Sequence, residues 1–317
     1  MAAIANGSAS STVPKAKPML KILLLGKNGQ VGWELQRSLA PLGEVLALDR
    51  HSTNYCGDLS KPEQLAETVL VYKPDFIVNA AAYTAVDKAE SESELARVLN
   101  AEAPAVLAKA AAQVGAWLIH YSTDYVFDGS GNHARQEGEG AGSLNVYGQT
   151  KLDGEKAIVV SGCTHLIFRT SWVYAARGGN FAKTMLRLAQ EREQLTVIND
   201  QHGAPTGADL IADVTAHAIR RVVNTQNIAF SGVYHLVASG ETTWHGYASY
   251  VIDQAKKLKP ELSWQVQNIA SVLTSAFPTP ATRPHNSRLC NTKLQNRFGL
   301  VLPPWQQGVD RMLAEIL

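Results

Sequence analysis

The sequence predicts an α/β fold built on an open, doubly wound and mostly parallel sheet, with a smaller C-terminal α/β lobe. Short apolar runs alternate with amphipathic stretches up to about Trp172, and such alternation is typical of a parallel sheet covered by helices on both faces. The alternation loosens afterwards, and 317 residues are more than one compact core usually needs. We therefore expect a disordered tail (1–18), a sheet domain (19–171) and a second lobe (172–317) that is partly interleaved with the sheet.

The apolar runs predict strands that are buried on both faces. The first run, "MLKILLLG", ends in glycine and is too short for a helix. Similar runs follow it at regular intervals. Strands are predicted at 19–26, 44–49, 75–82, 116–123 and 165–174.

The stretches between these strands have helical character. Val31, Leu35 and Leu39 recur at four-residue steps and form one apolar stripe. Because strand, helix and strand follow each other within about 30 residues, they form βαβ units. Helices are predicted at 27–43, 61–74, 91–115 with an interruption at Pro104, and 147–162.

The part of the chain after Trp172 is predicted from weaker patterns. Amphipathic stretches indicate helices, apolar runs indicate strands, and a segment with three prolines indicates an ordered loop. The helices are predicted at 180–193, 207–223 and 242–258, the strands at 195–200 and 232–239, and the loop at 274–289.

Composition excludes several classes of partner. The net charge is +1 and no run of basic residues reaches five, so we expect no binding to nucleic acid. No apolar stretch approaches the roughly 18 residues of a membrane span. The three cysteines have no metal-site spacing and are predicted to be free thiols in a reducing compartment. The tail lacks the apolar region of a secretory signal, so we expect a cytoplasmic protein.

A glycine-rich turn, "GKNGQVG", joins the first strand to the first helix. Gly26, Gly29 and Gly32 would let the backbone turn tightly and approach a pyrophosphate at the helix N-terminus. The spacing differs from the standard GxGxxG fingerprint, and a plain strand-to-helix turn is the alternative. The position between strand and helix favours a Rossmann-like dinucleotide site.

Asp49 ends the second predicted strand, 20 residues beyond Gly29. A carboxylate there can accept hydrogen bonds from a ribose 2′-hydroxyl, which favours NADH. Arg50 follows and can pair with the 2′-phosphate of NADPH, although a solvated surface charge is equally compatible. Asp58 and Leu59 are expected near the adenine, so both cofactors are predicted.

Tyr147 and Lys151 form a Y-x-x-x-K pair. Positions i and i+4 share one face of a helix, so the phenol and the ammonium can point into one site. Tyrosine ordinarily titrates near 10, and a neighbouring lysine lowers this pKa and makes the phenol a better acid. Thr123, at the end of the preceding strand, supplies a second hydroxyl to bind the same substrate oxygen. The pair alone also occurs by chance on helix surfaces.

Taken together, these motifs resemble the extended short-chain dehydrogenase/reductases, and within them the dTDP-4-dehydrorhamnose reductase family. The resemblance covers about residues 19–317 and is carried by "NAAAYTAVDKAE", "YSTDYVFDG", "NVYGQTKLDGE", "FRTSWVY" and "VINDQHGAPTGADLIAD". It implies reduction of the 4-keto group of dTDP-4-dehydro-L-rhamnose to dTDP-L-rhamnose, a polysaccharide precursor. Hydride would come from NADH or NADPH, and the proton from Tyr147.

The resemblance also implies two sets of binding residues. The expected cofactor-binding residues are Gly26, Gly29, Gln30, Val31, Asp49, Arg50, Asp58, Leu59, Ala80, Ala81, Tyr83, Asn100, Tyr147 and Lys151. The expected substrate-binding residues are Val86, Asp87, Thr123, Asp124, Tyr125, Trp172, Asn180, Arg283 and Asn286. For Trp172 the alternative is core packing, and for Arg283 it is anchoring of a loop.

Some members of the family bind magnesium at a dimer interface through glutamates. Glu34 matches one such position, and Asp209 stands where a glutamate is usual, so a structural Mg²⁺ and a homodimer are both open possibilities. A catalytic role for the ion is not expected. The alternative is a pair of solvated carboxylates, because hard cations need several converging oxygens.

Two rival functions remain open from the sequence. A nucleotide-sugar epimerase or dehydratase shares the superfamily, but Tyr125 stands where a dehydratase carries its second acid. A non-catalytic regulatory subunit, of the kind found with methionine adenosyltransferase, would tolerate loss of the tyrosine, lysine or threonine, and here all three are present.

Overall fold

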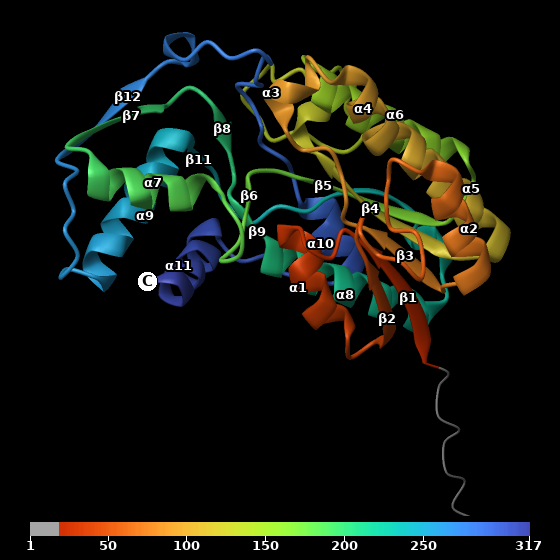
Figure 1. Ribbon diagram of the computed structural model, residues 1–317. Helices are drawn as coiled ribbons and strands as arrows, with labels where there is room; N and C mark the ends of the chain where they lie inside the picture. Colours follow the sequence, from red (N-terminus) through yellow and green to blue (C-terminus); the bar gives the residue numbers. More distant parts are fainter. Residues whose placement is uncertain (1–18) are drawn as a thin grey trace, which may run out of the picture.

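The computed structural model describes residues 19–317, and the predicted tail lies outside the described residues (Figure 1). Its centre is a six-stranded sheet in the order β10-β5-β4-β3-β1-β2, with each neighbouring pair parallel. This confirms the predicted doubly wound sheet. The strands are β1 (Leu20–Leu25), β2 (Gly43–Leu48), β3 (Phe76–Asn79), β4 (Trp117–Thr123), β5 (His165–Thr170) and β10 (Gly232–His235).

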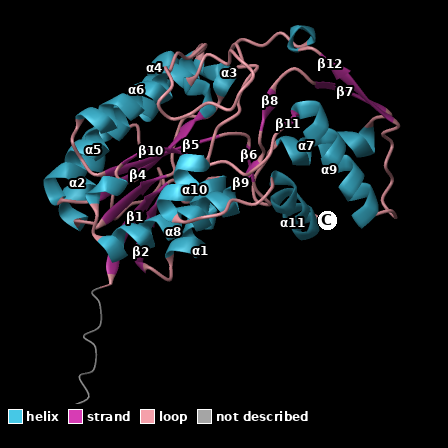
Figure 2. Ribbon diagram, turned by 180° about the vertical axis from the view of Figure 1, so that it is seen from behind, coloured by secondary structure: helices cyan, strands magenta, loops and turns pink. Residues whose placement is uncertain are grey.

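Helices cover both faces of the sheet, as Figures 1 and 2 show from opposite sides. One face carries α2 (Pro62–Tyr72), α5 (Ala103–Val114) and α6 (Val146–Val160), which pack side by side. The other carries α1 (Gln30–Leu39), α8 (Ala208–Thr225) and α10 (Thr292–Phe298). Two helices and one strand from beyond Trp172 thus belong to this sheet layer.

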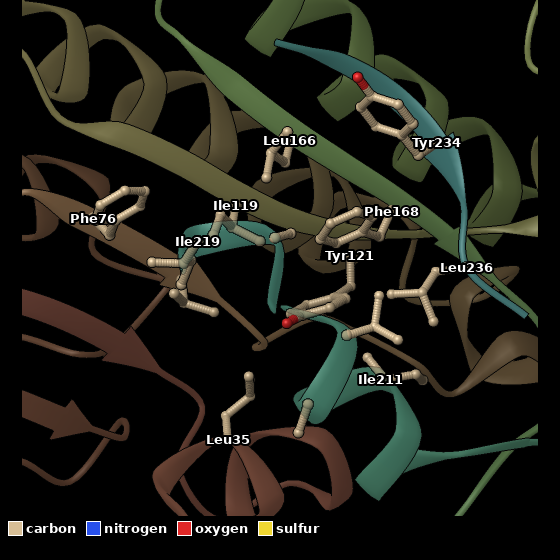
Figure 3. Packing of buried hydrophobic residues seen from close by; sticks show 14 of the residues in the cluster. Leu35, Phe76, Ile119, Tyr121, Leu166, Phe168, Ile211, Ile219, Tyr234 and Leu236 are labelled. Atoms are coloured by element: carbon tan, nitrogen blue, oxygen red, sulfur yellow. The ribbon is translucent and has the colours of Figure 1, made fainter. Parts of the chain in front are cut away.

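The core has one apolar layer on each face because successive strand residues point in opposite directions. Ile119, Tyr121 and Phe168 meet the α1 and α8 side chains in one layer (Figure 3). Leu118 and its neighbours meet α5 and α6 in the other. Burial of each such large side chain contributes about 1.5–3 kcal/mol. The Tyr121 hydroxyl is also satisfied, 2.8 Å from Thr215 Oγ1 in α8.

A smaller α/β part lies beside the sheet, on the left in Figure 1. Its aromatic core joins Tyr247 to Phe181 and Trp305, with ring centroids 5.5 and 5.8 Å apart. Its helices are α7 (Phe181–Glu191), α9 (Trp244–Leu258) and α11 (Trp305–Ile316). Short strand pairs complete it: β7 (Gln194–Ile198) with β12 (Asn268–Val272), β8 (His202–Gly203) with β11 (Thr242–Thr243), and β6 (Val173–Tyr174) with β9 (Thr206–Gly207).

Two predicted elements are divided differently in the structure. The strand predicted at 165–174 breaks at Trp172, whose φ of 48° lies in the left-handed region, so β5 and β6 are separate. The helix predicted at 91–115 was expected to be interrupted at Pro104, but the irregular turn precedes this proline. It runs as α4 (Ser93–Arg97), a π-helical turn (Val98–Glu102) and α5, where the proline occupies the first turn and its missing N–H is tolerated.

Several elements were not predicted, among them α3 (Val86–Ala89), β8, β9, β12, α10 and α11. The proline-containing segment begins with a short 3₁₀ turn, Thr274–Ala276, and continues as a loop between the two parts of the chain. Asn286 N donates to Gly129 O at 3.1 Å, and Ser287 N donates to His202 O at 2.7 Å. Within residues 19–317, no helix is long and apolar enough to cross a membrane.

The packing of α6 generates a stability prediction. A Cβ at Gly154 would lie 2.1 Å from Asn100 O, so Gly154→Ala forces α6 away from the π-helical turn. We expect a loss of about 1–3 kcal/mol in the free energy of unfolding, measured by urea titration. Gly138→Ala, where a Cβ meets nothing within 4 Å, is the control. Alanine is intrinsically the better helix former, so an unchanged or increased stability in Gly154→Ala would contradict this account.

Candidate active site

The glycine turn lies where the order of the sheet reverses. The chain passes from β1 outward to β2 and then returns to β3 on the other side of β1, and crevices at such points bind ligands in open α/β sheets. Gly26 has a φ of 85°, and a Cβ there would lie 2.7 Å from Ala81 N, two residues beyond the end of β3. A Cβ at Gly32 would lie 2.0 Å from Gly26 O, so both glycines are required by close approach.

A cleft of about 580 Å³ opens beside this turn. It gathers seven of the predicted cofactor-binding residues, Gly26, Gly29, Asp49, Arg50, Asp58, Leu59 and Ala81. It is also lined by residues that the sequence reasoning did not select, Asn28, His51, Ser60, Leu95 and Leu99 among them. Leu95 and Leu99 are four residues apart in a predicted helix, so the sequence places them on one face of it. This spacing does not reveal whether that face lines a cleft or packs in the core.

Asp49 presents an anionic carboxylate to the cleft. Its Oδ2 accepts a hydrogen bond from Asn28 Nδ2 at 2.5 Å, and its Oδ1 accepts one from His51 N at 2.9 Å. Partial burial acts to raise the pKa of Asp49, but hydrogen bonds from His51 and Ser52 and the charge of Lys27 outweigh it, so the pKa lies below its ordinary value. A charged acceptor therefore stands where a ribose hydroxyl was predicted to bind.

Tyr83 and Asn100 form a backbone clamp instead of lining the cleft. Asn100 Oδ1 accepts from Tyr83 N at 2.9 Å, and Asn100 Nδ2 donates to Tyr83 O at 3.0 Å. The Tyr83 hydroxyl donates to Glu92 Oε2 at 2.5 Å. Of the remaining predicted cofactor residues, Gln30 and Val31 open α1, and Ala80 follows β3 directly. The clamp holds the chain after β3 against the π-helical turn.

Tyr147 and Lys151 both face the carboxyl end of β4. Asn145 caps α6, accepting from Gly148 N at 2.8 Å, so Tyr147 and Lys151 fall in its first two turns. Tyr147 is hydrogen-bonded to the Thr123 side chain. Lys151 Nζ donates to Tyr121 O at 2.6 Å. The phenol and the amine therefore contact residues of the same strand two positions apart, Thr123 and Tyr121, as the i, i+4 spacing predicts.

Burial dominates the electrostatics of this pair. It raises the pKa of Tyr147 to about 12, against which the Thr123 hydrogen bond acts in the opposite direction. It lowers the pKa of Lys151 to about 8, although the Glu155 carboxylate acts to raise it. The lowering of the tyrosine pKa by the lysine, which the sequence predicted, does not appear: desolvation is the largest effect and raises the pKa of Tyr147, and Lys151 is not among the groups that lower it.

Close packing and a buried ion pair hold α6 in place. A Cβ at Gly148 would lie 2.2 Å from Tyr125 O, so only glycine permits this approach. Glu155 in α6 accepts three hydrogen bonds from Arg169 in β5, from Nε at 2.9 and 3.2 Å and from Nη2 at 2.6 Å. Both side chains are nearly inaccessible, and removing one partner of such a pair leaves an uncompensated buried charge.

Several predicted substrate-binding residues surround Tyr147. Its ring meets Tyr125 edge to face, with centroids 5.7 Å apart. Arg283 Nη1 and Nη2 donate to Asp87 Oδ1 and Oδ2 at 2.9 and 2.7 Å, and α3, which begins at Val86, packs against α6. Asp124 accepts from Thr123 Oγ1 at 3.0 Å, and burial raises its pKa to about 6.

Three predicted substrate-binding residues have local structural roles. Trp172 stacks on Trp244 with ring centroids 3.8 Å apart, which is the core-packing alternative. Asn180 caps α7, accepting from Lys183 N at 3.1 Å. Asn286 is buried and its Nδ2 donates to His133 O at 2.9 Å and to Ser130 O at 3.2 Å.

The carboxylates proposed for a metal ion line one pocket of about 250 Å³. Each is paired with an arginine, Glu34 with Arg37 at 3.5 Å and Asp209 with Arg311 at 3.4 Å. Among the residues that the structure describes, no group of three or more His, Cys, Asp or Glu side chains is arranged to hold a metal. The solvated-carboxylate alternative accounts for both residues, and magnesium gains no support.

These features define a class of protein, the short-chain dehydrogenase/reductase type of nicotinamide-dependent oxidoreductase, with a glycine turn at the switch point and a Tyr/Lys pair beside a strand-end threonine. The sequence profile of the family described as "RmlD substrate binding domain" matches residues 20–317, and the chain belongs to that family.

Relatives named dTDP-4-dehydrorhamnose reductase are similar over nearly the whole chain. The one from Escherichia coli K12 is 61% identical over 297 residues, covering 94% of this chain and 98% of the relative. The one from Burkholderia thailandensis is 49% identical over 300 residues, covering 94% and 99%. The chain therefore matches these enzymes over nearly all of the residues that the structure describes.

Solved structures of similar proteins share the fold of this chain. A dTDP-4-dehydrorhamnose reductase from Bacillus anthracis, in complex with NADP, has a TM-score of 0.82 at 32% identity and covers 94% of this chain and 99% of its own. A UDP-glucose 4-epimerase from Thermus thermophilus in complex with NAD has a TM-score of 0.74 at 17% identity, covering 93% and 98%, and at that identity it shares the fold alone.

The charge of Asp49 generates a prediction about cofactor choice. Asp49→Asn keeps the size of the side chain but removes the negative charge, which is worth about 1–2 kcal/mol against a nearby phosphate. We expect the Kd for NADPH, measured by fluorescence titration, to improve about tenfold relative to that for NADH. Asp253→Asn, on the exposed side of α9, is the control. An unchanged ratio of the two Kd values would rule out a position for Asp49 beside the 2′-substituent.

Proposed function

We propose that this chain reduces the 4-keto group of dTDP-4-dehydro-L-rhamnose to the alcohol of dTDP-L-rhamnose, using NADPH or NADH. The single observation that carries the proposal is the arrangement of Tyr147, Thr123 and Lys151 at the end of β4, beside the switch-point cleft. The 61% identity to a curated reductase supports the choice of substrate.

The cleft fits a dinucleotide on grounds of its own geometry. At Gly26 and Gly32 a Cβ would collide with the backbone after β3 and with the turn itself, so the two glycines permit the tight turn that leads into the amides of α1, where a pyrophosphate can bind. Asp49 and Arg50 offer an acceptor and a cation at the far edge of the cleft. When bound, the reduced nicotinamide would supply hydride to the carbonyl carbon.

Side chains of this protein would supply the proton that the carbonyl oxygen needs. The Tyr147 hydroxyl donates a proton to the carbonyl oxygen as the carbon accepts hydride, so the ketone becomes an alcohol and a phenolate remains. The Thr123 hydroxyl binds the same oxygen and orients it. A charged Lys151 stabilises the phenolate, which burial alone would disfavour. Solvent returns the proton to Tyr147 after turnover.

The rival functions gain less support. Tyr125 occupies the position after Asp124, and its ring packs against Tyr147, so the acidic pair expected of a dehydratase is missing from this strand end. The three proposed catalytic side chains are present and converge, which a purely regulatory subunit would not need. A cytoplasmic location and a homodimer remain predictions from the sequence.

Tyr147→Phe tests the proposed proton donor. Phenylalanine preserves the packing against Tyr125 but removes the acid, so kcat should fall at least about a hundredfold, the usual share of a general acid. The assay follows NADPH absorbance with dTDP-4-dehydrorhamnose generated enzymatically from dTDP-glucose. Tyr250→Phe, which loses an exposed hydrogen bond to Asp310, is the control. Full turnover by Tyr147→Phe would exclude this tyrosine as the acid.

A further inference from the structure

Three polar side chains form a buried row beneath the proposed site. Asn79, His120 and Lys151 are exposed by only 1, 1 and 2%. Asn79 in β3 and His120 in β4 are partners in the parallel register. Strand alternation turns both toward the face that α6 covers, the same face as Ile77 and Leu118. The row lies entirely inside the protein, where each polar atom needs a partner.

A continuous chain of hydrogen bonds links this row to the cleft. Ala81 N, in the cleft wall, donates to Asn79 Oδ1 at 3.2 Å. Asn79 Nδ2 lies 3.2 Å from His120 Nδ1, and His120 Nε2 lies 3.2 Å from Lys151 Nζ. Lys151 Nζ in turn donates to Tyr121 O at 2.6 Å.

The donors and acceptors in this chain fix its proton positions. Ala81 N holds Asn79 Oδ1, so the amide presents its NH₂ group to His120 Nδ1, which must accept. A neutral imidazole has one acceptor nitrogen, so the proton of His120 stands on Nε2 and faces Lys151. A charged Lys151 is an ammonium group, which can only donate hydrogen bonds, so it cannot bond to the N–H at His120 Nε2. A neutral Lys151 amine has a lone pair and can accept a hydrogen bond from it.

A charged Lys151 requires a different arrangement of the same row. His120 Nε2 would have to accept, which moves the ring proton to Nδ1. Asn79 would then have to turn its oxygen toward that proton, and it would lose its bond from Ala81 N. The charge of Lys151, the tautomer of His120 and the contact at the cleft wall therefore change together.

We propose that Asn79 and His120 are positioning residues that set the charge of Lys151 and couple it to the backbone of the cofactor cleft at Ala81. The effect of this arrangement on turnover rests on the proposed function, whereas the coupling between Lys151, His120 and Asn79 does not. Burial acts in the same direction, because it holds the pKa of His120 well below its ordinary value and lowers that of Lys151.

Other titratable and polar groups surround Lys151. Glu155 on its own helix acts to raise the Lys151 pKa, but it is already bonded to Arg169 from β5. Tyr147 lies one turn earlier on α6, and Asp124 follows the end of β4. From the π-helical turn, Asn100 contributes a neutral amide that is engaged with Tyr83 and Thr150. His120 is the titratable side chain in direct contact with the amine.

The tautomer of His120 can be read directly and without any activity. We expect ¹⁵N NMR of the full chain, labelled at its nine histidines, to show the His120 proton on Nε2 at about pH 10, where Lys151 is neutral, and on Nδ1 at about pH 6, where Lys151 is charged, because the Lys151 pKa is about 8. Its signal is identified by its loss in His120→Gln. A His120 tautomer that stays the same between these two pH values, or an imidazolium at about pH 6, would overturn the proposal.

Asn79→Asp tests the coupling. A carboxylate can keep the bond from Ala81 N and also accept from His120 Nδ1–H, which frees Nε2 to accept from an ammonium. Since activity should be lost as the pH rises through the Lys151 pKa of about 8, the variant should move this basic limb of kcat/KM upward by about one unit.

The control and the contrary outcomes separate the two proposals. His165→Gln replaces a buried histidine at the opposite end of β5, in register with Leu118, and should leave the limb in place. A uniform loss of rate in Asn79→Asp, with an unmoved limb, would indicate a merely structural role and overturn the coupling. If the unmodified protein reduces no substrate at any pH, the proposed function is refuted. The coupling is then tested by the NMR measurement alone.

Discussion

The close approach of α6 to the carboxyl end of β4 is the constraint on which the rest of the site depends. Two glycines, Gly148 and Gly154, allow the helix backbone to touch its neighbours where any Cβ would collide. The buried pair of Glu155 and Arg169 then ties the helix to β5. Because this contact is so tight, α6 brings Lys151 to the strand end as a fully buried group and Tyr147 as a partly buried one, and desolvation is the largest influence on the pKa of each.

That burial creates an electrostatic problem that the protein has to resolve. Desolvation raises the pKa of the Tyr147 phenol and lowers that of the Lys151 amine, so it disfavours the charged form of both. A proton donor benefits when its conjugate base is stabilised, and a positive Lys151 would do this. Glu155 favours that charge from within α6, whereas the row of Asn79 and His120 opposes it. The balance between them falls near neutral pH, where small changes in the cleft have the largest effect.

Much of this arrangement follows from local sequence patterns, and the rest does not. Five of the six parallel strands, the glycine turn and the shared face of Tyr147 and Lys151 were predicted because strand runs, a close-approach turn and i, i+4 spacing are short-range signals. The sixth strand, β10, was predicted as a strand of the second lobe. The break at Trp172 and the π-helical turn before Pro104 were missed because they arise from tertiary packing. Asn286 and Asn180 looked like ligand contacts, yet their amides bond to neighbouring backbone, which residue type alone does not reveal. His120 passed unnoticed because its partners come from two other elements.

The most direct test of the account is a crystal structure of the chain with NADP and the product nucleotide sugar. The account predicts that the nicotinamide lies over the carboxyl end of β4, with the Tyr147 hydroxyl about 2.6–3.2 Å from the sugar 4-oxygen and Thr123 bonded to the same oxygen. A sugar whose 4-oxygen contacts neither hydroxyl, or a nicotinamide directed away from α6, would contradict it.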